Sequence, residues 1–180
     1  MDLIESWAIK IATEIAPNEV DLAPAMTAAY LAGGEAREQL YMKSKGGGLG
    51  GFGSGGAQAI FPVLLSSISA AGNAILTILC SPDVGTVLTV IKTALEITNL
   101  AQRQKKVSEE LPVQTYRAFK QTVDAFSTGL KSSGYSQDQC DIMTGRFVVL
   151  LLEKPESAQE LIKAFTAAPN PKNQPRQKRK

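Results

Sequence analysis

The side chains best suited to nucleophilic chemistry are two cysteines, Cys80 and Cys140, and the sequence contains no histidine to activate them. This excludes Ser-His-Asp and Cys-His catalysis, HExxH metalloprotease chemistry and zinc sites that need imidazole. Cys140 falls in the first turn of an expected helix, where the helix dipole can lower the pKa of a thiol. However, no basic residue lies closer in sequence than Arg146. We therefore expect both cysteines to be packing residues, and we expect no metal, no cofactor and no enzymatic activity.

The second chemical candidate is a glycine-rich segment, GGGLGGFGSGG, at residues 46–56. It contains G-x-G-x-x-G twice, the pattern of dinucleotide-binding loops. Such a loop follows a strand and needs an acidic residue about twenty positions later. Here a charged helical stretch precedes the glycines, and the next acidic residue is Asp83. We interpret the segment as a flexible hinge. The alternative is that Leu49 and Phe52 contact a lipid interface.

Residues 46–82 contain no charged side chain, and residues 57–80 within them can form a helix long enough to cross a bilayer. The Ile, Leu, Val and Phe residues of this helix each favour insertion by about 0.3–0.6 kcal/mol, whereas Asn73 opposes it. The same length and composition suit the central core helix of a soluble protein. Both interpretations stay open.

Small and polar side chains form a stripe along this helix at spacings of three and four residues. In a membrane, such residues mediate contacts between helices. In a soluble bundle, their hydroxyls would instead bond back to carbonyl groups of the same helix. We expect the stripe to mediate helix–helix association through Ser66, Ser69, Ala70, Asn73, Ala74 and Thr77.

The C-terminal third gives the clearest helical signal. Ser136 and Gln139 have the spacing of a capping box, and Gly134 before them is expected to end the preceding helix. Residues 147–152 have the composition of a buried strand, but the capping box leads into them and predicts a helix. The preceding helix has a narrow apolar seam: Tyr116, Phe119, Val123, Phe126 and Leu130.

Two further helix starts are expected. Ser81 followed by Pro82 predicts one, and Ser157 with Glu160 predicts another through a second capping box. The helix after Ser81 has charged residues inside it, each costing about 2.5–3.5 kcal/mol at a bilayer centre. Residues 57–106 therefore predict a helical hairpin with one apolar arm and one amphipathic arm.

The charge of the chain is unevenly distributed. Nineteen basic and seventeen acidic residues give a net charge of +2, but residues 169–180 contain bases and no acid. This tail has no apolar side chain, so we expect it to be disordered. Without aromatic residues it lacks a stacking platform for single-stranded nucleic acid. Nucleic acid is therefore not an expected partner, and the tail is the one segment that could contact it. Contact with an anionic surface is expected for Lys172, Arg176, Lys178, Arg179 and Lys180.

Together these patterns predict an all-α helical bundle. Its expected parts are an N-terminal helical region at 1–45, a glycine-rich hinge at 46–56, the hydrophobic helical hairpin at 57–106, a C-terminal helical bundle at 107–168 and a disordered basic tail at 169–180. Asp2 and Glu5 stand where a secretory signal needs bases. The protein is therefore expected to be intracellular, in the cytoplasm or at the cytoplasmic face of a membrane, and not secreted.

The leading hypothesis is a membrane-associated, self-associating small helical protein that inserts into a membrane or forms a pore. The alternative is a soluble all-helical protein-interaction module, or adaptor, with residues 57–80 as its buried central helix. The first hypothesis expects self-association and has a membrane as its candidate partner. The second has another protein as its candidate partner.

Overall fold

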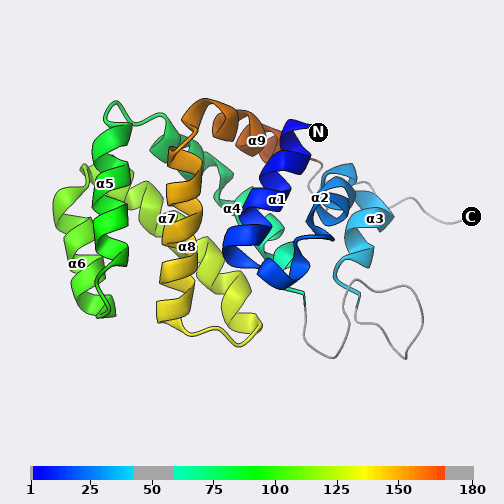
Figure 1. Ribbon diagram of the computed structural model, residues 1–180, viewed down its shortest axis with the longest axis horizontal. Helices are drawn as coiled ribbons and strands as arrows, with labels where there is room; N and C mark the ends of the chain where they lie inside the picture. Colours follow the sequence, from blue (N-terminus) through cyan, green and yellow to red (C-terminus); the bar gives the residue numbers. More distant parts are fainter. Residues whose placement is uncertain (1, 43–58, 169–180) are drawn as a thin grey trace, which may run out of the picture.

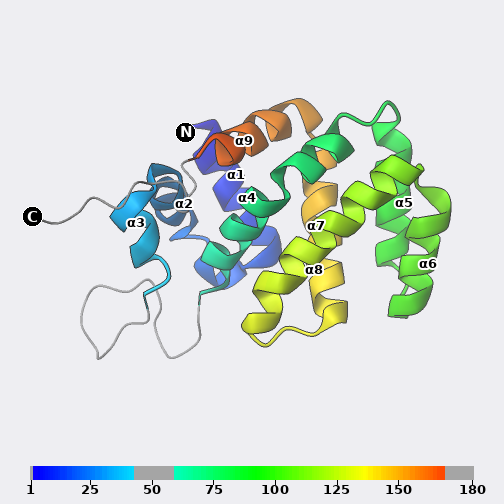
Figure 2. The ribbon, with the colours of Figure 1, turned by 180° about the vertical axis from the view of Figure 1, so that it is seen from behind.

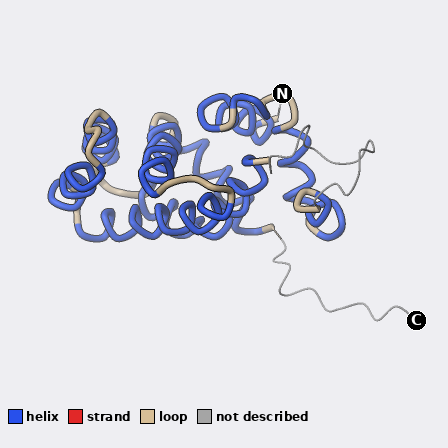
Figure 3. The backbone as a smooth tube through the Cα atoms, turned by 90° about the horizontal axis from the view of Figure 1, so that it is seen from below, coloured by secondary structure: helices blue, strands red, loops and turns tan. Residues whose placement is uncertain are grey.

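The computed structural model describes residues 2–42 and 59–168, and over these residues it is all-α, as predicted. The glycine-rich segment at 46–56 and the basic tail at 169–180 lie outside the described residues. Figure 3 shows the described elements as helices joined by loops. They are α1 (Leu3–Ile15), the 3-10 helix η1 (Pro17–Glu19), α2 (Ala23–Ala32), α3 (Gly34–Gln39), α4 (Ile60–Leu79), α5 (Val84–Leu95), α6 (Leu100–Glu110), α7 (Val113–Ser132), α8 (Gln137–Leu152) and α9 (Pro155–Ala167).

The uncharged helix α4 is the central element of the bundle. It packs chiefly against α7 and α9, and it also contacts α2, α5 and α8. Seen from behind, α4 and α7 run along the near face (Figure 2), whereas α1 and α8 lie in front of them in Figure 1. Thirteen of the twenty residues of α4 are buried. Its apolar length is therefore covered by other helices of the same chain.

Two glycines set how closely other helices approach α4. A Cβ on Gly129 of α7 would lie 2.7 Å from Val63 Cγ1 and 3.0 Å from Ser67 Oγ. A Cβ on Gly72 would meet the side chain of Thr166 in α9. The close contacts between α4 and its neighbours inside the bundle thus include Ser67, which faces α7, and Gly72, which faces α9.

The helix α5 follows α4 closely in sequence, but the two have different principal neighbours. α4 packs against α7 and α9, and α5 packs against α6 and α8 at one end of the molecule. The buried apolar residues of all these helices belong to one continuous core. The start of α5 also differs from the prediction: Asp83 caps it by accepting from the Thr86 backbone N–H at 3.2 Å. Ser81 and Pro82 therefore precede the helix.

The predicted end of α7 and the predicted start of α8 agree with the structure. Gly134 has a φ of 92°, the left-handed conformation common just after a helix, and α7 ends two residues before it. Ser136 accepts from the Gln139 backbone N–H at 3.2 Å, and the Gln139 side chain accepts from the Ser136 backbone N–H at 2.9 Å. The helix that follows includes residues 147–152.

The last helix begins earlier than its predicted capping box. α9 starts at Pro155, with Lys154 as its N-cap. Ser157 lies inside the first turn, where its hydroxyl donates to the Lys154 carbonyl at 3.2 Å. The prediction that Ser157 and Glu160 form a capping box is therefore wrong. The helix begins two residues earlier at Pro155, because proline is favoured at the first position of a helix.

A carboxylate from the first part of the chain caps the central helix. Glu19, at the end of η1, accepts from the Ile60 backbone N–H at 2.7 Å through Oε1 and from the Phe61 N–H at 2.9 Å through Oε2. The first N–H groups of a helix have no partner within the helix, and the helix dipole favours negative charge there. Glu19 therefore satisfies two of these donors and fixes the start of α4 against the α1–α2 connection.

We expect Glu19→Ala to lower the free energy of unfolding by about 1–2 kcal/mol, because two N–H groups of α4 lose their partner. The measurement is urea denaturation followed by circular dichroism. Glu160→Ala, at an exposed position of α9, is the matched control and should change it by less than about 0.5 kcal/mol. Equal effects of the two substitutions would show that the cap contributes nothing.

Candidate functional site

The part of α4 that the bundle leaves uncovered forms one wall of a groove of about 540 Å³. The groove lies between α2, α3, α4 and α9, at the end of the bundle opposite α5 and α6. The wall formed by α4 consists of Ser66, Ser69, Ala70 and Asn73. A ligand pocket of this size is within the usual range for small molecules and peptide side chains.

The groove gathers four of the six predicted stripe residues. Ala70 and Asn73 are exposed, and Ser66 and Ser69 are half-buried. Thr77 is exposed on the same helix but does not line the groove, and Ala74 is 9 % exposed and belongs to the core. The structure thus separates these two from the other four, and the association role of the stripe stays a prediction.

The hydroxyl groups of the stripe donate to carbonyl groups within the fold. Ser66 Oγ donates to the Val63 carbonyl at 2.9 Å, and Thr77 Oγ1 donates to the Asn73 carbonyl at 3.0 Å. Ser69 Oγ reaches the Phe165 carbonyl of α9 at 3.4 Å. Their hydrogen-bonding needs are met without a second helix in a membrane. What they offer to a partner is the acceptor capacity of each oxygen, beside the exposed amide of Asn73.

An aromatic and charged wall faces this stripe. The Arg37 guanidinium lies 3.6 Å from the centroid of the Tyr30 ring, in cation–π geometry. Tyr30 in turn stacks on Phe165 of α9, with ring centroids 5.7 Å apart. Arg37 is only 8 % exposed, and Glu38 beside it adds a negative charge to the lining. The groove therefore presents both signs of charge together with aromatic surface.

Sequence reasoning did not identify this wall. Tyr30 ends a run of apolar positions, and Arg37 lies in a short charged stretch, so neither spacing indicates a shared site. Gly33 alone separates the two helices, and the φ angles of 71° at Gly33 and 54° at Gly34, the first residue of α3, turn the chain there. That turn brings the guanidinium over the ring, and glycine-glycine was the sequence signal for it.

Tyr41 closes the groove near the start of α4. Its hydroxyl donates to the Pro62 carbonyl at 2.9 Å. Burial of the hydroxyl, which outweighs a hydrogen bond with Ser66, raises the pKa of Tyr41 to about 12. Tyr41 thus ties the segment after α3 to the first turn of α4, next to the position where Glu19 caps that helix.

The other candidates from the sequence lie elsewhere. Cys140 is fully buried, and burial raises the pKa of its thiol, so the expected lowering by the helix dipole does not prevail. Cys80 is exposed at the end of α4. In residues 2–42 and 59–168, no group of three or more Cys, Asp or Glu side chains is placed to hold a metal ion. Outside the described residues are Leu49, Phe52, Lys172, Arg176, Lys178, Arg179 and Lys180.

The chain matches no family model, no curated protein and no solved structure. Of the helices in the described part of the chain, α4 alone is long and apolar enough to cross a membrane by length and composition. Its best window has a mean hydropathy of 1.6, and 67 % of that window is buried inside the bundle. A core helix of a soluble protein has the same properties.

The raised pKa of Tyr41 makes a prediction about stability at high pH. The folded state keeps the phenol protonated above the ordinary pKa of 10.0. The stabilisation is therefore fully present below pH 10 and is lost as pH rises towards about 12. Tyr41→Phe should destabilise the protein at pH 8, and the difference from the wild type should shrink by pH 11.5. The measurement is urea denaturation at both pH values, and a constant difference would contradict the assignment.

Proposed function

We propose that this protein is a non-enzymatic helical interaction module that works as an intact bundle and self-associates through the groove beside α4. The observation that carries the proposal is the position of α4. It serves as the central core helix, and four residues of its small and polar stripe, Ser66, Ser69, Ala70 and Asn73, remain accessible along a groove. The proposal joins the adaptor hypothesis for α4 with the expectation of self-association.

The energetics of α4 support a module that stays folded. Its fully buried side chains include Phe61, Leu64, Leu65, Ile68, Ile75 and Ile78. Each contributes about 1.5–3 kcal/mol to stability through burial. If α4 moved into a bilayer, the lipid would replace the apolar surroundings that these side chains lose. The departure of α4 would, however, remove the main packing partner of α7 and α9 and uncover part of the buried core.

The lining of the groove supports a second copy of the chain as the partner. Two identical surfaces that meet about a twofold axis must be complementary to themselves. Glu38, exposed on α3, provides a carboxylate, and the nearly buried Arg37 lies beside it in the lining. Asn73 provides donors and an acceptor, and Ala70 leaves room for close approach of a second backbone. Aromatic side chains such as Tyr41, which is 39 % exposed, are also enriched at protein interfaces.

Membrane association is the second candidate, because α4 has the length and hydropathy of a spanning helix. In this candidate α4 leaves the bundle and inserts, and the stripe then contacts other helices in the lipid. The two candidates differ in what residues 46–82 contribute. Their deletion removes the core helix in the first candidate, whereas in the second it removes a detachable segment.

We expect Ala70→Arg to weaken self-association at least about tenfold, which corresponds to about 1.4 kcal/mol. The arginine would fill the groove at an exposed position and leave the core untouched. The measurement is sedimentation velocity over a range of concentrations. Thr77→Arg is the matched control, since it places the same side chain at an exposed position of the same helix outside the groove, and it should leave the association unchanged.

A wild-type chain that stays monomeric at every concentration would contradict the proposal, as would equal weakening by the two arginines. Co-sedimentation with liposomes tests the second candidate. Both arginines add about 2.5–3.5 kcal/mol to insertion near a bilayer centre, so an inserting α4 would lose lipid binding in both variants. The membrane candidate also requires that a chain lacking residues 46–82 still folds, which circular dichroism measures.

A further inference from the structure

A second cavity, of about 160 Å³, lies at the other end of the bundle between α5, α6, α7 and α8. Part of its lining is apolar and buried, at Ile91, Val107, Phe119 and Val123, and polar side chains make up the rest. An apolar cavity of about 150 Å³ in a protein interior holds one benzene molecule. The space here is therefore large enough for a compact ligand with a single six-membered ring.

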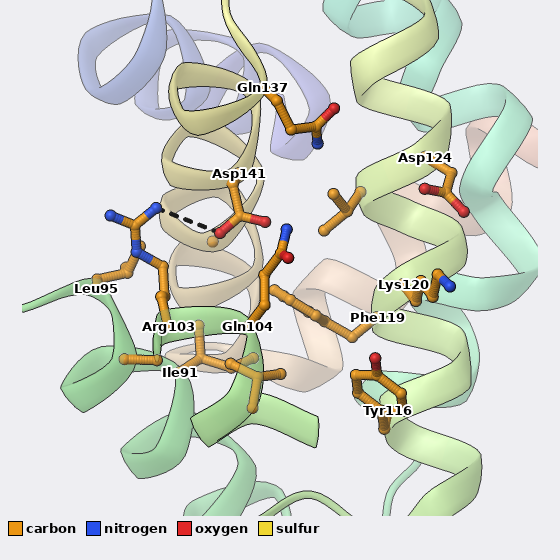
Figure 4. Close-up of a pocket in the computed structure, with 14 residues that line it drawn as sticks. Ile91, Leu95, Arg103, Gln104, Tyr116, Phe119, Lys120, Asp124, Gln137 and Asp141 are labelled. Atoms are coloured by element: carbon orange, nitrogen blue, oxygen red, sulfur yellow. Dashed lines mark hydrogen bonds and ion pairs between the residues drawn. The ribbon is translucent and has the colours of Figure 1, made fainter. Parts of the chain in front are cut away.

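One buried carboxylate is placed in the wall of this cavity, beside its apolar part. Asp141 of α8 lines it, and its side chain is 6 % exposed. In Figure 4 one oxygen of Asp141 faces Arg103, and the carboxylate lies beside Gln104. Burial raises the pKa of Asp141, while hydrogen bonds with Arg103 and Gln104 oppose the rise. A charged group in such surroundings is costly unless a partner compensates it.

The arginine beside Asp141 has better partners elsewhere. Arg103 donates to the Ile97 carbonyl at 2.8 Å and 3.1 Å. Its Nη1 lies 2.8 Å from Asp138 and 3.4 Å from Asp141. One guanidinium thus stands against two carboxylates, and Asp141 has the longer contact. The cluster of Arg103, Asp138 and Asp141 carries one more carboxylate than guanidinium, and Asp141 is the buried carboxylate that is less closely compensated.

The rest of the lining suits a cation. Phe119 and Tyr116 place aromatic rings in the cavity wall, and aromatic faces attract ammonium groups. Lys120 and Asp124, both exposed on α7, carry opposite charges and give the entrance no net charge. Gln104 is also exposed. Its amide can therefore turn outward and leave its place beside Asp141 to a ligand N–H.

We propose that this cavity binds a small organic cation, a primary ammonium on a compact apolar body of about one ring, with its N–H groups donating to Asp141. The apolar body occupies the space above Phe119 and Val123, and the ammonium compensates the excess charge beside Arg103. This site is separate from the groove, and it does not depend on self-association.

The test uses benzylamine hydrochloride on the full-length chain, with benzyl alcohol as the neutral probe of the same shape and sodium chloride to match ionic strength. We expect benzylamine to raise the Tm in proportion to the logarithm of its concentration, with a Kd of about millimolar for a ligand of this size. Chemical-shift changes in an NMR titration should concentrate on residues lining the cavity. Equal effects of the amine and the alcohol would overturn the ammonium assignment.

Asp141→Asn and Asp138→Asn form a matched pair, since each removes one carboxylate from Arg103 and only Asp141 lines the cavity. We expect Asp141→Asn to weaken benzylamine binding at least tenfold and Asp138→Asn to change it less than threefold. A purely structural ion-pair cluster predicts similar binding in both variants, and that result would overturn the proposal. If Asp141→Asn fails to fold, Gln104→Trp, which blocks the cavity from an exposed position, must abolish binding instead.

Discussion

A helix of twenty residues without a charge can remain in water only if other helices cover it, and this constraint organises the bundle. α7 and α9 cover most of α4, and they approach it closely because Gly129 and Gly72 carry no side chain. The remaining helices extend this arrangement to both ends of the molecule (Figure 1). The bundle is thus built around the segment that is least soluble by itself.

The coverage of α4 is incomplete along one strip, and the polar residues are found there. Ser66 donates to a carbonyl of its own helix, Ser69 reaches the Phe165 carbonyl of α9, and the amide of Asn73 is exposed. The polar side chains of α4 are therefore found where the other helices leave it least covered, and they form its wall of the groove.

The sequence predicted what depends on local interactions. The all-α class followed from periodicity, and most of the seam is buried at Phe119, Val123, Phe126 and Leu130. The capping box of Ser136 and Gln139 was predicted because both partners lie within one turn. The predicted N-caps of α5 and α9 were wrong by two and three residues, since several polar residues compete for a cap and backbone geometry chooses among them.

The features of the candidate sites depend on contacts between distant parts of the chain. Arg103 and Asp141 are 38 residues apart, and Glu19 and Ile60 are 41 apart. No periodicity connects such pairs, and only the folded bundle brings them together. The stripe on α4 was visible because it lies on one helix, whereas the Tyr30–Arg37 wall opposite it required the turn at Gly33. The sequence pattern therefore predicted the α4 side of the groove and missed the opposite side.

The contacts at the start of α4 have a consequence for the connection that precedes it. Glu19 holds the first N–H groups of α4, and Tyr41 holds the Pro62 carbonyl. The entry point of the helix is therefore anchored on both sides by residues outside the connecting segment. The position of the first turn of the core helix is therefore set by two side chains from the N-terminal part of the fold, a carboxylate on its N–H groups and a phenol on its carbonyl.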